Sequence, residues 1–219
     1  MSDAHAGPLA HHFESLEQQR ETCAIGMWAF LVQEVMFFGG LFAAYLTYRH
    51  LYPRAFLEGS GHLDVGLGTL NTAVLLASSL TMALAVRGAQ VGKRGQSAGF
   101  VLLTMLLGSA FLVVKLIEYG HKLEAHLVPG LDWQPAAGAE PRLNVFLGLY
   151  FAMTGVHALH MVIGLGLLAI VLARTLRGRY TPENHVGVEV LGLYWHFVDL
   201  VWIFLFPLLY LLGRHVPHA

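Results

Sequence analysis

The sequence predicts an all-α integral membrane protein, folded as a bundle of five transmembrane helices. Of the 219 residues, 56% are hydrophobic and only 12% carry a charged side chain, which lies outside the range of soluble globular domains. Five stretches also reach the roughly 20 apolar residues that a helix needs to cross about 30 Å of hydrocarbon. Together these observations place the chain in a lipid bilayer.

The predicted spans follow one another along the chain, and several are long enough to tilt in the membrane. They cover residues 24–51, 65–87, 97–121, 143–175 and 185–213. We expect them to form a single transmembrane domain, residues 24–214, with uninterrupted helices. The N-terminal tail, residues 1–23, lacks the basic start and the apolar core of a signal peptide and is expected to be retained.

The connections between the spans carry residues that break helices or form turns. Pro53 and the Gly-Ser-Gly run at 59–61 follow the first span, residues 88–95 follow the second, residues 129–141 follow the third, and residues 174–182 follow the fourth. These segments are predicted to be turns and loops.

Positive charge gathers in two of the connections without nearby acidic residues. The basic side chains are Arg87, Lys93 and Arg94 after the second span, and Arg174, Arg177 and Arg179 after the fourth. Cytoplasmic loops of membrane proteins are enriched in lysine and arginine. Both connections are therefore predicted to face the cytoplasm, with the N-terminus cytoplasmic and the C-terminus periplasmic.

Composition also excludes several classes of function. The formal net charge is −1, which provides no field to attract nucleic acid. The single cysteine, Cys23, rules out an internal disulfide and a Cys-x-x-Cys metal or redox motif. Small residues four positions apart, such as Gly39 with Ala43 and Gly148 with Ala152, predict close packing between helices.

One acidic side chain, Glu34, lies well inside the first predicted span. A charged group at this depth is costly, so an unpaired Glu34 is expected to be protonated. Two interpretations stay open at this point. Glu34 is either a neutral acid hydrogen-bonded to a neighbouring helix, or a group that handles protons or contacts lipid.

Polar side chains also recur in the fourth and fifth spans. His157 and His160 are three residues apart and are expected on one helical face. Glu189, His196 and Asp199 are separated by seven and three residues, so they share roughly one side of the last helix. We expect these two faces to meet and to form interhelical hydrogen bonds.

The same five residues also raise the question of a metal site, because imidazole and carboxylate ligate zinc, iron and copper. Di-iron bundles combine a Glu-x-x-His motif on each of two helices with a glutamate from each of two others. Here the spans carry one His-x-x-His and one His-x-x-Asp instead. We therefore predict no metal on this chain; bis-histidine haem ligation is open by residue count but is not favoured.

The third span contains a lysine and a glutamate one turn apart, Lys115 and Glu118. An ion pair between residues i and i+3, or extension of the side chains toward the membrane surface, accounts for both. We assign no chemistry to them.

Several stretches resemble subunit III of the haem-copper cytochrome oxidases, and they occur in the family's order. They are E-V-M-F-F-G-G at 34–40, L-N-T-A-V-L-L-A-S-S at 70–79, E-Y at 118–119, G-V-H-A-L-H-M-V-I-G at 155–164, and H-V-G-V-E at 185–189 followed by Y-W-H-F-V-D at 194–199. The chain resembles the five-helix bacterial form, which lacks the first two of the seven helices of mitochondrial relatives.

The resemblance implies a subunit of a cytochrome c oxidase in the bacterial inner membrane, without haem or copper of its own and with no catalytic residue. Its implied partners are oxidase subunits I and II, with further small subunits or a respiratory supercomplex left open. It implies that the chain stabilises subunit I, supports proton uptake and binds phospholipid in a cleft. Glu34 corresponds to the family's intramembrane carboxylate, and Arg174 and Arg179 to basic groups at lipid headgroups.

Other functions remain as alternatives. The equivalent subunit of a quinol oxidase, or an accessory subunit of a nitric oxide reductase, would share these motifs. An independent proton-coupled transporter would use Glu34 and the histidines as a proton relay. Transport is less favoured because the five spans show no inverted repeat.

Overall fold

The computed structural model describes residues 14–134 and 137–211. Its regular elements, in chain order, are α1 (Leu16–Leu51), α2 (Pro53–Gly61), α3 (Val65–Gln90), α4 (Arg94–Glu124), β1 (Leu127–Val128), β2 (Asp132–Trp133), α5 (Leu143–Leu176), α6 (Val186–Phe206) and the π-helical turn η1 (Pro207–Leu211). Strands β1 and β2 pair antiparallel in a small hairpin.

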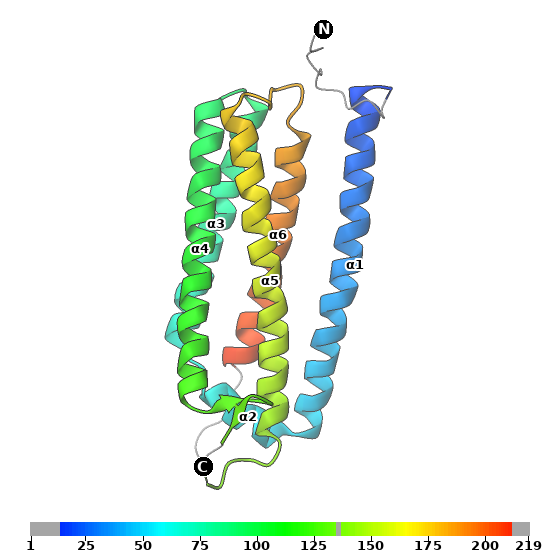
Figure 1. Cartoon of the computed structure of the whole chain (residues 1–219). Helices are drawn as coiled ribbons and strands as arrows, with labels where there is room; N and C mark the ends of the chain where they lie inside the picture. Colours follow the sequence, from blue (N-terminus) through cyan, green and yellow to red (C-terminus); the bar gives the residue numbers. More distant parts are fainter. Residues whose placement is uncertain (1–13, 135–136, 212–219) are drawn as a thin grey trace.

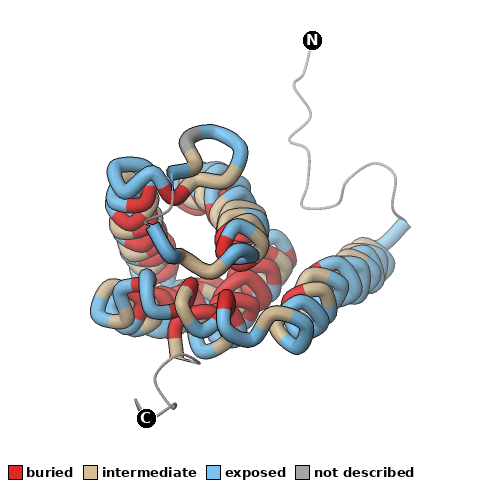
Figure 2. Tube along the Cα trace, turned by 90° about the horizontal axis from the view of Figure 1, so that it is seen from below, coloured by how far each residue is buried: buried red, intermediate tan, exposed pale blue. Residues whose placement is uncertain are grey.

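Five helices are long and apolar enough to cross a membrane: α1, α3, α4, α5, and α6 continued by η1. This confirms the predicted all-α membrane fold with five spans. The helices run along a common direction, with α3, α4, α5 and α6 grouped together and α1 set to one side (Figure 1). Seen along the bundle, α1 leans away and exposes most of its turns (Figure 2).

The helices extend beyond the predicted spans at several ends. Helix α1 begins at Leu16, inside the predicted tail 1–23, because the Ser15 side chain accepts a hydrogen bond from the backbone N–H of Gln18 at 3.1 Å and caps the helix. The first 13 residues of that tail, and the predicted domain end at 212–214, lie outside the described residues.

Two predicted loops contain regular structure: α2 lies in the connection after the first span, and β2 lies in the connection after the third. Helix α2 occupies the segment after the first span; it begins with Pro53, which suits the first helical turn, and buries Phe56. The Phe56 ring packs edge-on against Tyr45 of α1 and Phe146 of α5, with centroids 5.1 and 5.3 Å apart. The prediction of a turn at 59–61 is therefore wrong, because this packing keeps a short helix folded across the end of the bundle.

The last predicted span is one continuous helix from Val186 to Leu211, but it changes its helix type near the end. Proline 207 lacks a backbone N–H, and the chain changes there from an α-helix to the π-helical turn η1. The Tyr45 hydroxyl donates a 2.6 Å hydrogen bond to the carbonyl of Leu208 in this turn. As a result Tyr210 is fully buried inside the bundle.

Trp195 of α6 forms the centre of the core. Its indole N–H donates a 2.8 Å hydrogen bond to Ser78 of α3, and its ring lies against Gly108 of α4 and Gly164 of α5. A Cβ atom added to either glycine would lie 2.7 or 2.9 Å from the ring. These glycines therefore allow four helices to meet around one tryptophan.

Within the described part of this chain, the glycines predicted to mediate close packing do not lie against a neighbouring helix. A Cβ atom added to Gly39 or Gly148 would meet open space. The spacing of small residues does not identify the neighbouring helix, and here the residues that pack closely are others.

Candidate functional site

A cleft separates α1 from α5 and α6, with a volume of about 570 Å³. Its walls are mostly apolar, and the apolar residues include Phe30, Ile163, Leu167, Ile170 and Leu191. The polar lining residues are Glu34, His160, Arg174, Tyr180 and Tyr194. A cleft with long apolar walls and a few polar groups suits an amphipathic molecule.

Glu34 and His160 face each other across this cleft. Glu34 Oε2 lies 3.1 Å from His160 Nε2, and the two side chains are only 11% and 14% exposed. His160 Nδ1 lies 2.9 Å from the carbonyl of Val156, so Nδ1 carries the proton that it donates. A hydrogen bond between Glu34 and His160 then needs a donor on either the carboxyl group or Nε2.

Aromatic side chains fix the position of His160. The Tyr194 hydroxyl donates a 2.9 Å hydrogen bond to the backbone carbonyl of His160. The ring of Phe38 lies 5.4 Å from the imidazole, and Phe30 stacks on Tyr194 at 5.8 Å. The Glu34–His160 pair therefore joins α1 to α5, and aromatic side chains pack around it.

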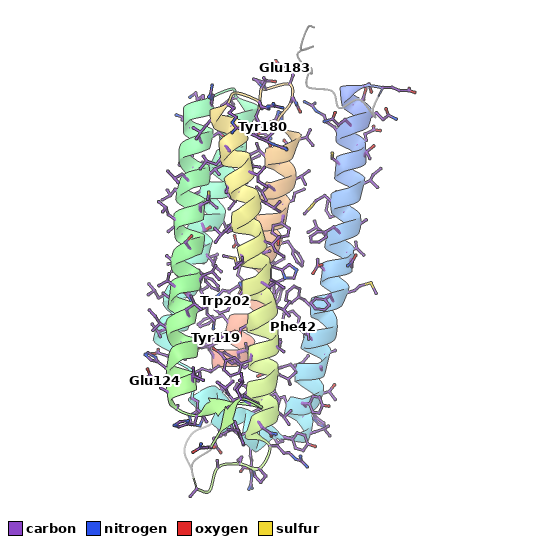
Figure 3. The ribbon with its side chains drawn as sticks, in the orientation of Figure 1. Phe42, Tyr119, Glu124, Tyr180, Glu183 and Trp202 are labelled. Carbon is purple, nitrogen blue, oxygen red and sulfur yellow. The ribbon has the colours of Figure 1, made fainter. Side chains whose placement is uncertain are left out.

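One end of the cleft is basic. Arg174, in the last turn of α5, lines the cleft together with Tyr180. Arg179 is exposed and is not among the lining residues, so the structure brings only the first of the two predicted headgroup arginines to the cleft. Arg20 of α1 donates a hydrogen bond to the backbone carbonyl of Glu183, which ties α1 to the α5–α6 connection at this end. Tyr180 and Glu183 mark it in Figure 3.

His157 does not share the environment of His160. It is buried between Phe111 and Trp202, whose ring centroids are 5.4 and 5.3 Å away. Neither of its ring nitrogens has a hydrogen-bond partner among the described residues. His157 thus faces the bundle interior, whereas His160 faces the cleft.

The three polar residues predicted on one side of α6 also have different neighbours from one another. Glu189 contacts His185, the residue just before α6, at 3.1 Å and accepts a 2.7 Å hydrogen bond from Gln90. His196 Nδ1 lies 2.7 Å from the Ser79 hydroxyl of α3. Asp199 is buried and its carboxylate accepts no hydrogen bond from the described residues, although the Ser79 side chain lies near it.

The predicted bonding between the polar faces of α5 and α6 is therefore wrong. Three-residue spacing groups side chains on a helix, but it does not say which neighbour each side chain meets. Within residues 14–134 and 137–211, no three His, Cys, Asp or Glu side chains form a group that could hold a metal ion. Whether the chain is free of metal stays a prediction.

A buried ionic cluster lies toward the opposite end of the bundle from Arg174. Lys115 Nζ is 2.9 Å from Glu118 Oε2, and the two side chains are 4% and 3% exposed. The hydroxyls of Tyr150 and Tyr210 donate to Glu118 Oε1 at 2.9 and 2.6 Å. The predicted ion pair is confirmed, but its extension to the membrane surface is wrong.

Aromatic rings enclose the ammonium group of this cluster. The rings of Tyr119, Tyr150, Trp202 and Tyr210 lie 5.0 to 5.6 Å from Lys115 Nζ, in cation–π range. Figure 3 shows Tyr119 and Trp202 in this part of the bundle. In the sequence only Tyr119 lies beside the lysine–glutamate pair, because Tyr150 comes from α5, Trp202 from α6 and Tyr210 from η1.

Comparison with known proteins gives consistent results. The family model described as cytochrome c oxidase subunit III matches residues 10–214. A cytochrome c oxidase subunit 3 from Synechocystis sp. is 38% identical over 191 residues, covering 85% of this chain and 74% of that protein. One from Thermostichus vulcanus is 36% identical over 194 residues, covering 87% of each chain. A cytochrome bo(3) ubiquinol oxidase subunit 3 from Pseudomonas aeruginosa is 29% identical over 213 residues, covering 97% of this chain and 95% of that protein.

Proposed function

The chain belongs to the cytochrome c oxidase subunit III family, and from this premise we propose that it serves a haem-copper cytochrome c oxidase as a non-redox subunit. It is a multi-pass membrane protein and a subunit III of an oxidase. In the proposal it packs against subunits I and II, which hold the haem and copper. The cytochrome c oxidase relatives share more identity with it than the ubiquinol oxidase relative does, which favours cytochrome c as the electron donor.

The electron donor is tested on the intact complex. The oxidase is purified through an affinity tag on this chain, its subunits are identified by mass spectrometry, and oxygen uptake is measured with reduced cytochrome c and with ubiquinol. We expect cytochrome c to support the faster uptake. Faster uptake with ubiquinol would replace the proposal by the quinol oxidase alternative.

The cleft carries the second part of the proposal, that this subunit binds phospholipid. Its apolar walls match acyl chains, and Arg174 at one end provides a guanidinium suited to a phosphate. The Glu34–His160 pair joins α1 to α5 across the same cleft, and these two ionisable groups support the proposed contribution to proton uptake by subunit I.

The orientation in the membrane follows from the charged connections. The start of α1, the α3–α4 connection and the α5–α6 connection lie at one end of the bundle, and α2 and the β-hairpin lie at the other (Figure 1). The two basic connections are therefore on the same side, which we propose is the cytoplasmic side of a bacterial inner membrane. The basic end of the cleft then faces the cytoplasmic leaflet.

Replacing Glu34 with alanine is expected to leave assembly intact and to weaken lipid retention about five- to tenfold, which corresponds to losing one hydrogen bond of about 1 kcal/mol. The mutant oxidase should also lose activity over successive turnovers faster than the wild type. Glu21→Ala removes an exposed carboxylate from the same helix and serves as the control. If E34A and E21A inactivate at the same rate and retain the same lipids, the proposed role of Glu34 is wrong.

Replacing Arg174 with glutamine is expected to lower retention of anionic phospholipid by about ten- to a hundredfold, because a charge-assisted hydrogen bond contributes about 1.5–3 kcal/mol. Native mass spectrometry of the purified complex counts the retained lipids. Arg177→Gln removes the same charge from an exposed position of the adjoining connection that does not line the cleft. Equal losses in the two variants would show that general surface charge, and not the cleft, binds the lipid.

A further inference from the structure

A polar pair lies on the outer surface of the bundle, halfway along two spans. Ser79 is near the middle of α3 and His196 is near the middle of α6. Both are half-buried, and the Ser79 hydroxyl is 2.7 Å from His196 Nδ1. The other ring nitrogen of His196, Nε2, makes no hydrogen bond with the described residues.

The pair is surrounded by exposed apolar side chains. On α6, Leu193, His196 and Leu200 follow each other at the three- and four-residue spacing that defines one side of a helix. On the adjoining α3, Leu76 and Leu80 are exposed beside Ser79. We call this surface the α3–α6 face; it consists of Leu76, Ser79, Leu80, Leu193, His196 and Leu200.

A third polar group lies directly behind the pair. Asp199 is one turn from His196 and only 3% exposed, and neither of its carboxylate oxygens is hydrogen-bonded within the described part of the chain. Ser79, His196 and Asp199 together therefore carry more hydrogen-bonding groups than they can pair with one another. An imidazole with one free ring nitrogen, next to a buried carboxyl group without a partner, favours contact with a group that donates or accepts hydrogen bonds.

Hydrocarbon provides no such group at this depth. Lipid headgroups lie at the ends of the spans, and water is absent from the bilayer core. Polar side chains in transmembrane helices therefore face other protein segments or water-filled cavities. His196 is half-buried between the exposed Leu193 and Leu200, and a hydroxyl, amide or carboxyl side chain of another transmembrane helix would provide a hydrogen bond to its Nε2 atom.

We propose that the α3–α6 face is the docking surface for a transmembrane helix of another oxidase subunit, which presents a hydrogen-bonding side chain to His196. This inference rests on the proposed function, because it requires that the chain assembles into an oxidase. The outward surface of α4 around Val113 and Ile117, in contrast, presents exposed apolar side chains and suits contact with lipid.

Site-specific photo-crosslinking in native membranes tests the docking surface. The photoreactive residue benzoylphenylalanine is placed at Leu76 or Leu200 on the α3–α6 face, and at Val113 or Ile117 on α4 as controls. Mass spectrometry identifies the crosslinked species after irradiation. We expect a second oxidase subunit at the first two positions and phospholipid at the controls. Phospholipid alone, or a second copy of this chain, at positions 76 and 200 would overturn the inference.

Substitution of His196 tests the hydrogen bond itself. Interhelical hydrogen bonds in membranes contribute modestly, so His196→Leu is expected to reduce co-purification of this chain with the haem-containing subunits about three- to tenfold. His196→Gln keeps a hydrogen-bonding group and should restore most of the yield. Equal yields for wild type and His196→Leu, or equal losses for both variants, would contradict the role of His196.

The two proposals fail in different ways. If the wild-type chain does not co-purify with haem-containing subunits, the proposed function is wrong. If it co-purifies but crosslinks to them from α4 and not from the α3–α6 face, the proposed function stands and the docking surface is wrong.

Discussion

Replacing Lys115 with methionine is expected to destabilise the folded subunit by about 3–5 kcal/mol, because removing one member of a buried ion pair leaves the other charge without compensation. The Glu118 carboxylate would remain enclosed, with only the hydroxyls of Tyr150 and Tyr210 as donors. Unfolding of the purified subunit in detergent, followed by tryptophan fluorescence, measures the loss. Lys93→Met removes an exposed lysine and is the control.

The double variant Lys115→Met, Glu118→Leu separates the ion pair from the packing around it. Replacing both members of a buried pair by apolar residues of similar size is often tolerated. We expect the double variant to be more stable than K115M alone, although the two tyrosines lose their acceptor. A double variant less stable than either single variant would show that the aromatic enclosure, and not charge compensation, dominates the cluster.

Replacing Gly164 with leucine is expected to cost about 3 kcal/mol, at the upper end of the range for overpacked cores. The Cβ atom alone would lie 2.9 Å from the Trp195 ring and 3.1 Å from the Tyr194 ring. Trp195 cannot move away, because Gly108 lies against its other edge and Ser78 accepts its N–H. The same unfolding experiment measures the effect.

Gly166→Leu provides the matched control for this substitution. It lies on the same helix two positions away, where a Cβ atom meets open space and the residue is exposed. A surface change of this kind is expected to alter stability by no more than about 0.5 kcal/mol. Similar destabilisation by G164L and G166L would mean that glycine is needed for backbone flexibility in α5 and not to accommodate Trp195.

The sequence predicted the spans well because the thickness of the bilayer sets a minimum length for an apolar stretch, and such stretches are visible directly in the sequence. Helix α2 was missed because its Gly-Ser-Gly run resembles a turn, and only the packing of Phe56 against α1 and α5 stabilises it as a helix. The change to a π-helical turn at Pro207 was not predicted either. Local sequence could not show that the following turn would direct Tyr210 into the core.

The polar residues were found individually, but most of their partners were not predicted. Glu34 and His160 were both identified, yet the His160 side chain was expected to bond with polar side chains of α6 and instead meets Glu34 of α1. Lys115 and Glu118 were paired correctly, but their burial depends on Tyr150 and Tyr210, which lie far away along the chain. Spacing within one helix defines a face, whereas the choice of neighbour is a property of the whole bundle.

The lean of α1 also affects how the subunit fills the two leaflets. At the end with the β-hairpin α1 lies close to α5, while toward the other end it diverges from the group (Figure 1). The protein with its cleft is therefore a wedge, with a larger perimeter in one leaflet than in the other. Lateral pressure in the bilayer favours filling of the cleft. Acyl chains bound there would occupy the space between α1 and the other helices, as additional transmembrane helices would.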